Sequence, residues 1–198
     1  MRSITFIAAI VLIITSCGTS KKATESAQIP EEKTPTVQAP EGIEFKTIEN
    51  YSDFALINLP VSGKGFKENT DYTGAEFPVL EYSSQQLIVR ANLNDFEGPL
   101  EEQFEKLKRT LYFKVKPEEE VTFEKSVIGE YETALIKIYR KSASGYQYLK
   151  YGYLISHNNK AATFFIKEGY FLPESDVDAY IATLDETMQY MIKTCKFN

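Results

Sequence analysis

Four apolar segments between residues 121 and 167 constrain the fold more than any other feature of this chain. Residues 121–127, 133–141, 146–156 and 161–167 are rich in the aliphatic, aromatic and β-branched side chains that strands favour. Four-residue turns, at 142–145 and 157–160, separate the last three segments. Connections this short make neighbouring strands pair in an antiparallel manner, so the sequence predicts a β-meander.

Both faces of this meander are predicted to be covered, because apolar residues occupy both parities in segments 134–139 and 163–166. Two amphipathic helices are expected to provide the cover, one over residues 99–111 and one over residues 177–195. Ser175 and Asp178 have the spacing of a capping pair at the start of the second helix. Earlier strands are expected at residues 54–59, 77–82 and 86–92. The sequence therefore predicts a single α+β domain over residues 43–198, with helices packed on an antiparallel sheet.

An export signal precedes this domain. The apolar run at residues 4–14 is too short to span a bilayer, for which roughly 20 residues are needed. It ends at Ile14-Thr15-Ser16-Cys17, which resembles the lipobox of bacterial lipoproteins. The resemblance implies that residues 1–16 are removed as a signal peptide and that Cys17 is lipidated on its sulfur and acylated on its new amino group. Several acyl chains hold a protein stably on a membrane, so anchoring through Cys17 is expected.

A disordered linker is expected between the anchor and the domain. Residues 17–42 contain the lipidated cysteine, many polar residues and several prolines, and no aromatic residue. A flexible chain of this length has a reach of roughly 25 to 30 Å. Gly18 stands where an aspartate marks inner-membrane retention in many lipoproteins, so the resemblance implies an outer-membrane protein that faces the periplasm.

Charge and residue usage exclude several function classes. Removing residues 1–16 takes away Arg2 and changes the formal charge from −6 to −7, and an acidic domain is not expected to bind nucleic acid. His157 is the only histidine and falls in a polar turn, so neither a serine-type triad nor a zinc site is predicted. No cofactor, metal or catalytic residue is expected. Cys195 has no partner within the domain and is interpreted as a small apolar residue on the last helix.

Three other polar groups are interpreted as structural. The cluster of Asn92, Asn94, Asp95 and Glu97 fails the EF-hand pattern and precedes a helix. Gly63-Lys64-Gly65 lacks the pattern of a phosphate-binding loop and is expected to be a flexible loop. The acidic run 118–120 is expected to be a solvated turn rather than a carboxylate pair.

The order of elements resembles the Mog1/PsbP-like family. The resemblance rests on the strand that ends at Leu59-Pro60, the helix that begins at Leu100, and the long meander that leads into a final helix. It implies an α/β/α sandwich and a protein that is mostly non-catalytic and acts as an accessory, assembly or binding module. A tryptophan common in that family is missing, since the chain contains none, and Phe66 is a candidate to replace it.

The tyrosines provide the candidate binding surface. Tyr146, Tyr148 and Lys150 share one face of their predicted strand, opposite the face that carries Tyr151 and Tyr153. An aromatic face of this kind can bind a sugar, a peptide or a protein, or it can lie beneath a helix. The sequence therefore favours a lipid-anchored module that binds another envelope protein. The alternatives are a small hydrolase that uses clustered carboxylates, and an inhibitor or immunity lipoprotein.

Overall fold

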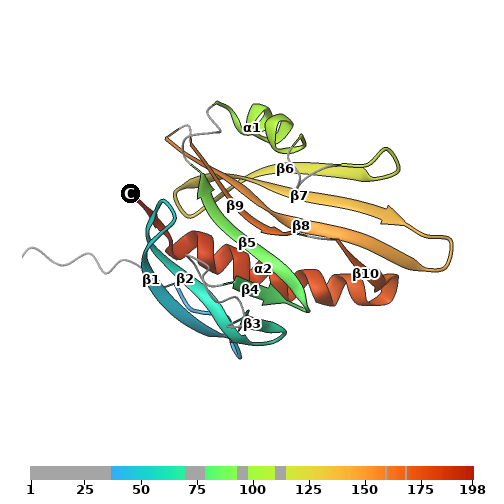
Figure 1. Cartoon of the computed structure of the whole chain (residues 1–198), viewed down its shortest axis with the longest axis horizontal. Coiled ribbons are helices and arrows are strands. Elements are labelled where there is room, and N and C mark those ends of the chain that lie inside the picture. The colour runs from blue at the N-terminus through green and yellow to red at the C-terminus, as the bar shows by residue number, and fades with distance from the viewer. Residues whose placement is uncertain (1–36, 70–78, 93–97, 110–114, 159, 168) are drawn as a thin grey trace, which may run out of the picture. The chain divides into compact units, whose positions relative to one another are not determined.

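A computed structural model gives the structure of the protein and describes residues 37–69, 79–92, 98–109, 115–158, 160–167 and 169–198. Nearly all of the described strands belong to one antiparallel path, in the order β1-β2-β3-β4-β5-β9-β8-β7-β6 (Figure 1). Two short strands lie off this path, since β10 pairs with β8 and β11 pairs with β2. The strands are β1 (Glu44–Tyr51), β2 (Phe54–Gly63), β3 (Phe66–Asn69), β4 (Val79–Tyr82), β5 (Gln85–Asn92), β6 (Glu120–Ile128), β7 (Tyr131–Lys141), β8 (Tyr146–His157), β9 (Lys160–Ile166), β10 (Tyr170–Pro173) and β11 (Lys196–Phe197).

One long helix, α2 (Val177–Thr194), covers one face of the sheet and contacts β2, β6 and β8 (Figure 1). Its buried residues recur at helical spacing, and they include Leu184, Met188 and Met191, which no solvent reaches. The aromatic and aliphatic side chains that line this face of the strands complete the larger core, including Phe54, Tyr151 and Phe164. The sheet is therefore organised around α2.

The opposite face of β6 to β9 carries a second, smaller core. Helix α1 (Leu100–Leu107) places Leu100, Phe104 and Leu107 over Ile136 and neighbouring apolar residues. The rings of Phe104 and Phe123 stack at a centroid distance of 5.2 Å. With eight residues, α1 reaches only part of this face.

The predicted α/β/α sandwich, implied by the resemblance to Mog1/PsbP-like proteins, is wrong. The described chain is mostly antiparallel sheet, 55% strand and 21% helical, with one C-terminal helix of substantial length. Helices therefore do not form a layer on each side of the sheet. The physical reason is the length of α1, because a helix with two turns cannot cover strands of 9 to 12 residues.

The local predictions agree more closely with the structure. The strands at 121–127, 133–141, 146–156 and 161–167 are confirmed as β6 to β9, and the final helix is confirmed as α2. The capping prediction is wrong, since Asp176 is the N-cap of α2 and Ser175 donates a hydrogen bond to its carboxylate. Gly63-Lys64-Gly65 is not a loop of its own but the tight turn between β2 and β3.

Four described strands were not predicted, namely β1, β3, β10 and β11. The predicted signal peptide and most of the predicted linker lie outside the described residues, as do Asn94, Asp95 and Glu97 of the polar cluster. Neither described helix combines the length and apolarity that crossing a membrane requires.

Candidate functional site

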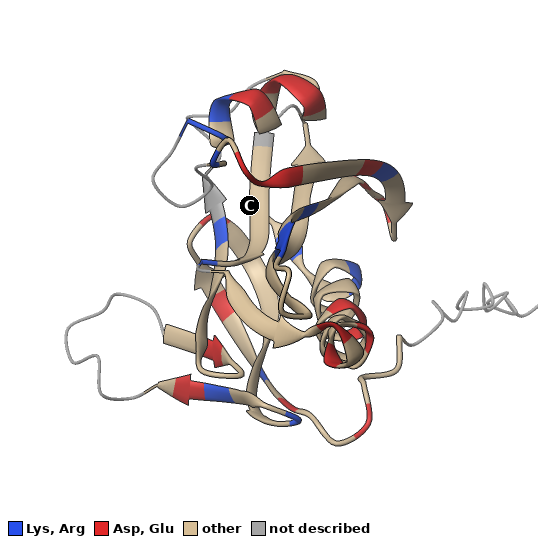
Figure 2. Ribbon diagram, turned by 90° about the vertical axis from the view of Figure 1, so that its right-hand side faces the viewer, with Lys and Arg blue, Asp and Glu red and all other residues tan. Residues whose placement is uncertain are grey.

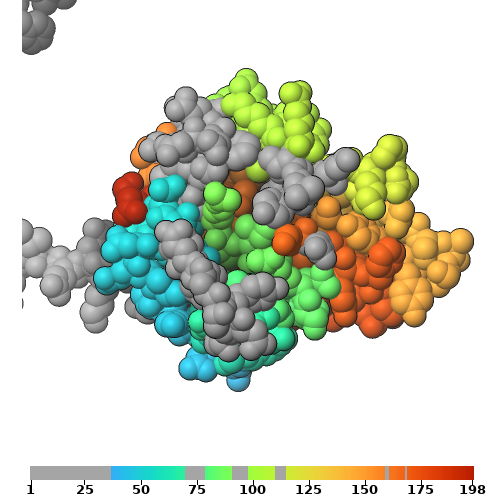
Figure 3. Space-filling view, in the orientation of Figure 1, coloured from blue at the N-terminus to red at the C-terminus, as the bar shows by residue number. Residues whose placement is uncertain are grey.

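The most distinctive surface of the described chain lies at the end of the β7–β8 hairpin that is farthest from α1. Arg140 on β7, Tyr148 on β8 and Phe171 on β10 are direct cross-strand neighbours, because Arg140 pairs with Tyr148 and Tyr148 pairs with Phe171. Tyr146, two residues before Tyr148, shares their face of the sheet. We call Arg140, Tyr146, Tyr148 and Phe171 the aromatic surface. Its strands lie side by side at the right of Figure 3, in the yellow to orange-red part of the colour scale.

The hydrogen-bond ladder explains why the rings meet. The amide of Glu174 donates to the carbonyl of Gly145 at 3.0 Å, which fixes the phase of the β8–β10 ladder. Tyr148 and Phe171 are consequently a non-hydrogen-bonded pair, the position at which cross-strand side chains come closest. Their ring centroids lie 5.1 Å apart with the planes tilted by 58°.

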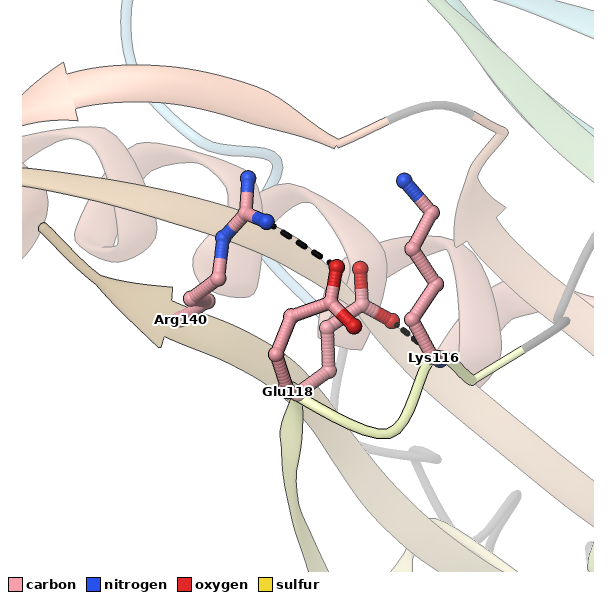
Figure 4. A network of polar contacts seen from close by, with 4 residues as sticks. Lys116, Glu118 and Arg140 are labelled. Carbon is pink, nitrogen blue, oxygen red and sulfur yellow. Dashed lines mark hydrogen bonds and ion pairs between the residues drawn. The ribbon is translucent and has the colours of Figure 1, made fainter.

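Arg140 is held over both rings. Its guanidinium carbon lies 5.7 Å from the centroid of Tyr148 and 5.9 Å from that of Phe171, within the range of cation–π attraction. One terminal nitrogen, Nη1, donates to the Glu118 carboxylate at 3.1 Å (Figure 4). The side chain is therefore oriented from two directions, by the ring faces and by an acceptor before β6.

Gly169 fixes the position of the Tyr148 ring. A Cβ atom at residue 169 would lie 2.0 Å from Cζ of Tyr148, so only glycine leaves room for the ring in this orientation. The ring is half-buried, whereas Phe171 and Tyr146 keep 55% and 46% of their surface exposed. They are two of the four exposed large hydrophobic residues among the described ones, and the other two are Val37 and Val127.

The predicted members of this site are only partly together. Tyr146 and Tyr148 lie on the aromatic surface, but Lys150 is only 8% exposed. Lys150 pairs with Ile138, a member of the core beneath α1, so it lies one row further into the covered part of the face. The alternation of residues along the strand predicted the correct face for Lys150. It carries no information about how far along that face helix α1 extends.

Sequence reasoning missed Arg140 and Phe171. Both depend on pairing between segments that are distant in sequence, and β10 has only four residues. The one local signal was the apolar run Tyr170-Phe171-Leu172 directly before Pro173, which indicates a short strand that ends at a proline.

The acidic run 118–120 does not form a carboxylate pair. Glu118 binds Arg140, and Glu119 accepts the backbone N–H of Lys116 (Figure 4). Glu120 accepts the hydroxyl of Tyr139. Each carboxylate thus has a separate partner. The sequence predicted a solvated turn here, whereas the structure shows that each of the three glutamates makes its own polar contact.

A second polar cluster joins α2 to β8. Oδ1 of Asp185 accepts hydrogen bonds from the hydroxyls of Tyr151, at 2.6 Å, and Tyr153, at 2.5 Å, while Gln189 donates to Oδ2 at 2.9 Å. Burial raises the pKa of both phenols, and the bonds to Asp185 raise the pKa further. Both tyrosines therefore stay protonated at neutral pH, and this cluster works as a structural tie between the helix and the sheet.

Asp185 also lines a depression of about 460 Å³ together with Glu186 and Lys193. Consecutive residues of a helix do not face each other, so Asp185 and Glu186 are not arranged as an acid–base pair. Hydrogen bonds to Lys67 and Lys125 lower the pKa of Glu81 and Glu101, respectively. No group of three or more metal-ligating side chains occurs within the described residues.

The remaining candidates pack against the core. Cys195 is buried, its sulfur donates to the carbonyl of Ile192, and burial raises the pKa of its thiol to about 12, so the predicted packing role is confirmed. His157 is not in a free turn. It ends β8, is partly buried, and stacks on Phe197 at 5.0 Å.

In the view of Figure 2, lysine and arginine positions alternate with acidic ones, and acidic positions predominate on α1 and on the visible end of α2. No model of a known protein family matches the chain, and no curated protein matches it either.

Proposed function

We propose that the protein is a lipid-anchored envelope protein that acts by binding another envelope protein through the aromatic surface. The observation that carries the proposal is an arginine pre-oriented over two aromatic rings, one of them largely exposed, on a face that α1 leaves open. The lipobox-like sequence at Cys17 supports the anchor. Gly18 after this cysteine supports a proposed location in the outer membrane, facing the periplasm.

The composition of the surface resembles that of protein interfaces. Tyrosine, phenylalanine and arginine are enriched at the centres of interfaces, and tyrosine and arginine are common among the residues that contribute most binding energy. The strand ends that carry the rings also carry an ion pair, between Lys141 and Glu174 at 3.6 Å. The surface thus has an apolar centre and a charge-balanced rim, which fits another protein better than a nucleic acid or an anionic lipid.

The aromatic surface lies far from Val37, the first residue that the structure describes. Val37 and Tyr131 line one depression at the start of β7, and Arg140 lies near the end of that strand. Nine residues at roughly 3.3 Å each separate Tyr131 from Arg140, about 30 Å in total. Val37, the first described residue, therefore lies at the end of the hairpin opposite the aromatic surface.

The hydrolase alternative gains no support from the described carboxylates. It requires two adjacent acidic side chains with raised pKa, whereas Asp185 is engaged by two tyrosines and the shifted carboxyl groups are lowered. An inhibitor or immunity lipoprotein would use the same surface and is a special case of the proposal.

Affinity purification after crosslinking on intact cells tests the proposal. The double variant Tyr146→Ala/Phe171→Ala should lose a partner that the wild-type protein captures in stoichiometric amount. Val127→Ala is the matched control, because it removes an exposed apolar side chain at the other end of the described domain. A partner captured equally by all three proteins would contradict a role for the aromatic surface.

A further inference from the structure

Arg140 has hydrogen-bonding capacity that the described residues do not use. A guanidinium carries five N–H donors, and among the described residues its one acceptor is Glu118, bound through Nη1. The ring faces of Tyr148 and Phe171 contact the guanidinium but accept no conventional hydrogen bond. The outward edge of the guanidinium therefore still offers donors, and it lies beside the exposed ring of Phe171.

This arrangement lowers the cost of binding. A free arginine side chain loses rotamer entropy when a ligand fixes it, but Arg140 is already fixed by the two rings and by Glu118. A guanidinium in a fixed orientation can bind a carboxylate through two parallel hydrogen bonds, which a lysine cannot do.

We propose that the aromatic surface recognises a carboxylate that stands next to an aromatic or large aliphatic side chain of the partner protein. The carboxylate pairs with the outward donors of Arg140, and the apolar side chain packs on Phe171 and Tyr146. The inference rests on the proposed function and adds the chemistry of the bound segment.

Addition of a partner strand to β10 is the less suitable mode. Because the amide of Glu174 faces β8, the outward edge of β10 consists of the backbone groups of Phe171 and Pro173. Pro173 has no N–H to donate, and a proline on an edge strand opposes further pairing. The partner is therefore recognised through the side chains of the aromatic surface rather than through the backbone of β10.

A titration with matched small probes tests the inference on the full chain in detergent. N-acetylphenylalanine carries the ring and the carboxylate, and N-acetylphenylalaninamide carries the ring alone. Backbone amide shifts should map the binding of both to residues 140, 146, 148 and 171. The acid should bind about fivefold more tightly than the amide, as expected for a partly exposed ion pair.

Variants separate recognition from folding. Arg140→Gln should abolish the preference for the acid, and Arg140→Lys should retain part of it because the charge remains. Lys125→Gln is the control, because Lys125 is another exposed cation paired with a glutamate, Glu101, and lies outside the surface. Thermal unfolding of each variant confirms that the fold is intact.

The outcomes distinguish carboxylate recognition from the proposed function, which is binding of another envelope protein. Equal binding of acid and amide, or no shifts at the surface with either probe, would overturn the inference. If Phe171 still captured a protein partner in cells, the proposed function would survive that result. A preference for the acid without any cellular partner would overturn the protein-binding function and leave a carboxylate site.

Discussion

Gly152 shows how a single residue fixes the packing of β8 against β9. A Cβ atom at this position would lie 2.3 Å from the carbonyl oxygen of Phe164 and 2.3 Å from Cδ2 of Phe165. The carbonyl belongs to a backbone held in the sheet, so the strands themselves would have to separate. Gly145 contrasts with it, because its φ is 75° but nothing lies within 4 Å of an added Cβ.

Gly152→Ala is therefore expected to lower the free energy of unfolding by about 3 kcal/mol, because it overpacks a rigid site. Gly145→Ala should cost about 1 kcal/mol, the strain of a left-handed alanine. Urea denaturation of both variants measures the difference. Equal costs would show that the strands adjust more freely than the contacts at Gly152 imply.

Cys195 gives a second prediction at the residue scale. Burial raises the pKa of its thiol to about 12, and the thiolate is the reactive form, so the native protein should resist alkylation at mildly alkaline pH. Mass spectrometry of the peptide that contains Cys195 should show rapid modification only after denaturation. Fast labelling of the native protein would place the sulfur at the surface and contradict the packing role.

At the scale of elements, periodicity predicted long segments well and short ones badly. The strands β6 to β9 and helix α2 each repeat their apolar pattern over many residues, so local sequence was sufficient. The strands β3, β10 and β11 have two to four residues, and their existence depends on partners distant in sequence. The residues of the candidate site show the same contrast. Tyr146 and Tyr148 could be predicted from alternation along a long strand, whereas Phe171, on a short strand, could not.

Helix α1 illustrates the dependence of a short element on tertiary packing. Isolated helices of eight residues are not stable in water, so α1 is held by its buried residues, among them Phe104, whose ring stacks on Phe123.

Phe104→Ala should accordingly lower the free energy of unfolding by about 3 kcal/mol, as expected for a buried aromatic residue. The amides of α1 should also exchange hydrogen faster in this variant than in the wild-type protein. The amides of α2 should still exchange more slowly than those of α1. Unchanged protection of α1 in this variant would mean that other contacts hold the helix.

At the scale of the whole molecule, buried phenols connect stability to alkaline pH. Burial raises the pKa of Tyr51 from 10.0 to about 12, and the pKa values of Tyr151 and Tyr153 are also raised. Above pH 10 the unfolded chain releases protons that the folded chain still holds. The stabilisation is therefore complete below pH 10 and is lost as the pH rises through the pKa values of the folded state.

The urea midpoint should thus fall between about pH 9 and about pH 11. Tyrosinate absorbance of the buried phenols should increase together with the loss of β-sheet signal in circular dichroism. Full ionisation of every tyrosine near pH 10, with the fold retained, would contradict the burial of these phenols.

The positions of the exposed apolar residues give the central claim its geometry. Val37 and Val127 lie near the start of β7 and the end of β6, and Tyr146 and Phe171 lie at the opposite end of the hairpin. The four exposed large hydrophobic residues of the described chain thus form two pairs, one near the start of β7 and one on the aromatic surface. If the protein binds through the aromatic surface, only the second pair should contact a partner.

Site-specific photocrosslinking in intact cells tests this claim most directly. A benzoylphenylalanine at position 171 should give one dominant adduct with an envelope protein, and the same group at position 127 should give none. Arg140→Gln should weaken the adduct at 171. Identical adducts from both positions, or an adduct from position 127 alone, would contradict binding through the aromatic surface.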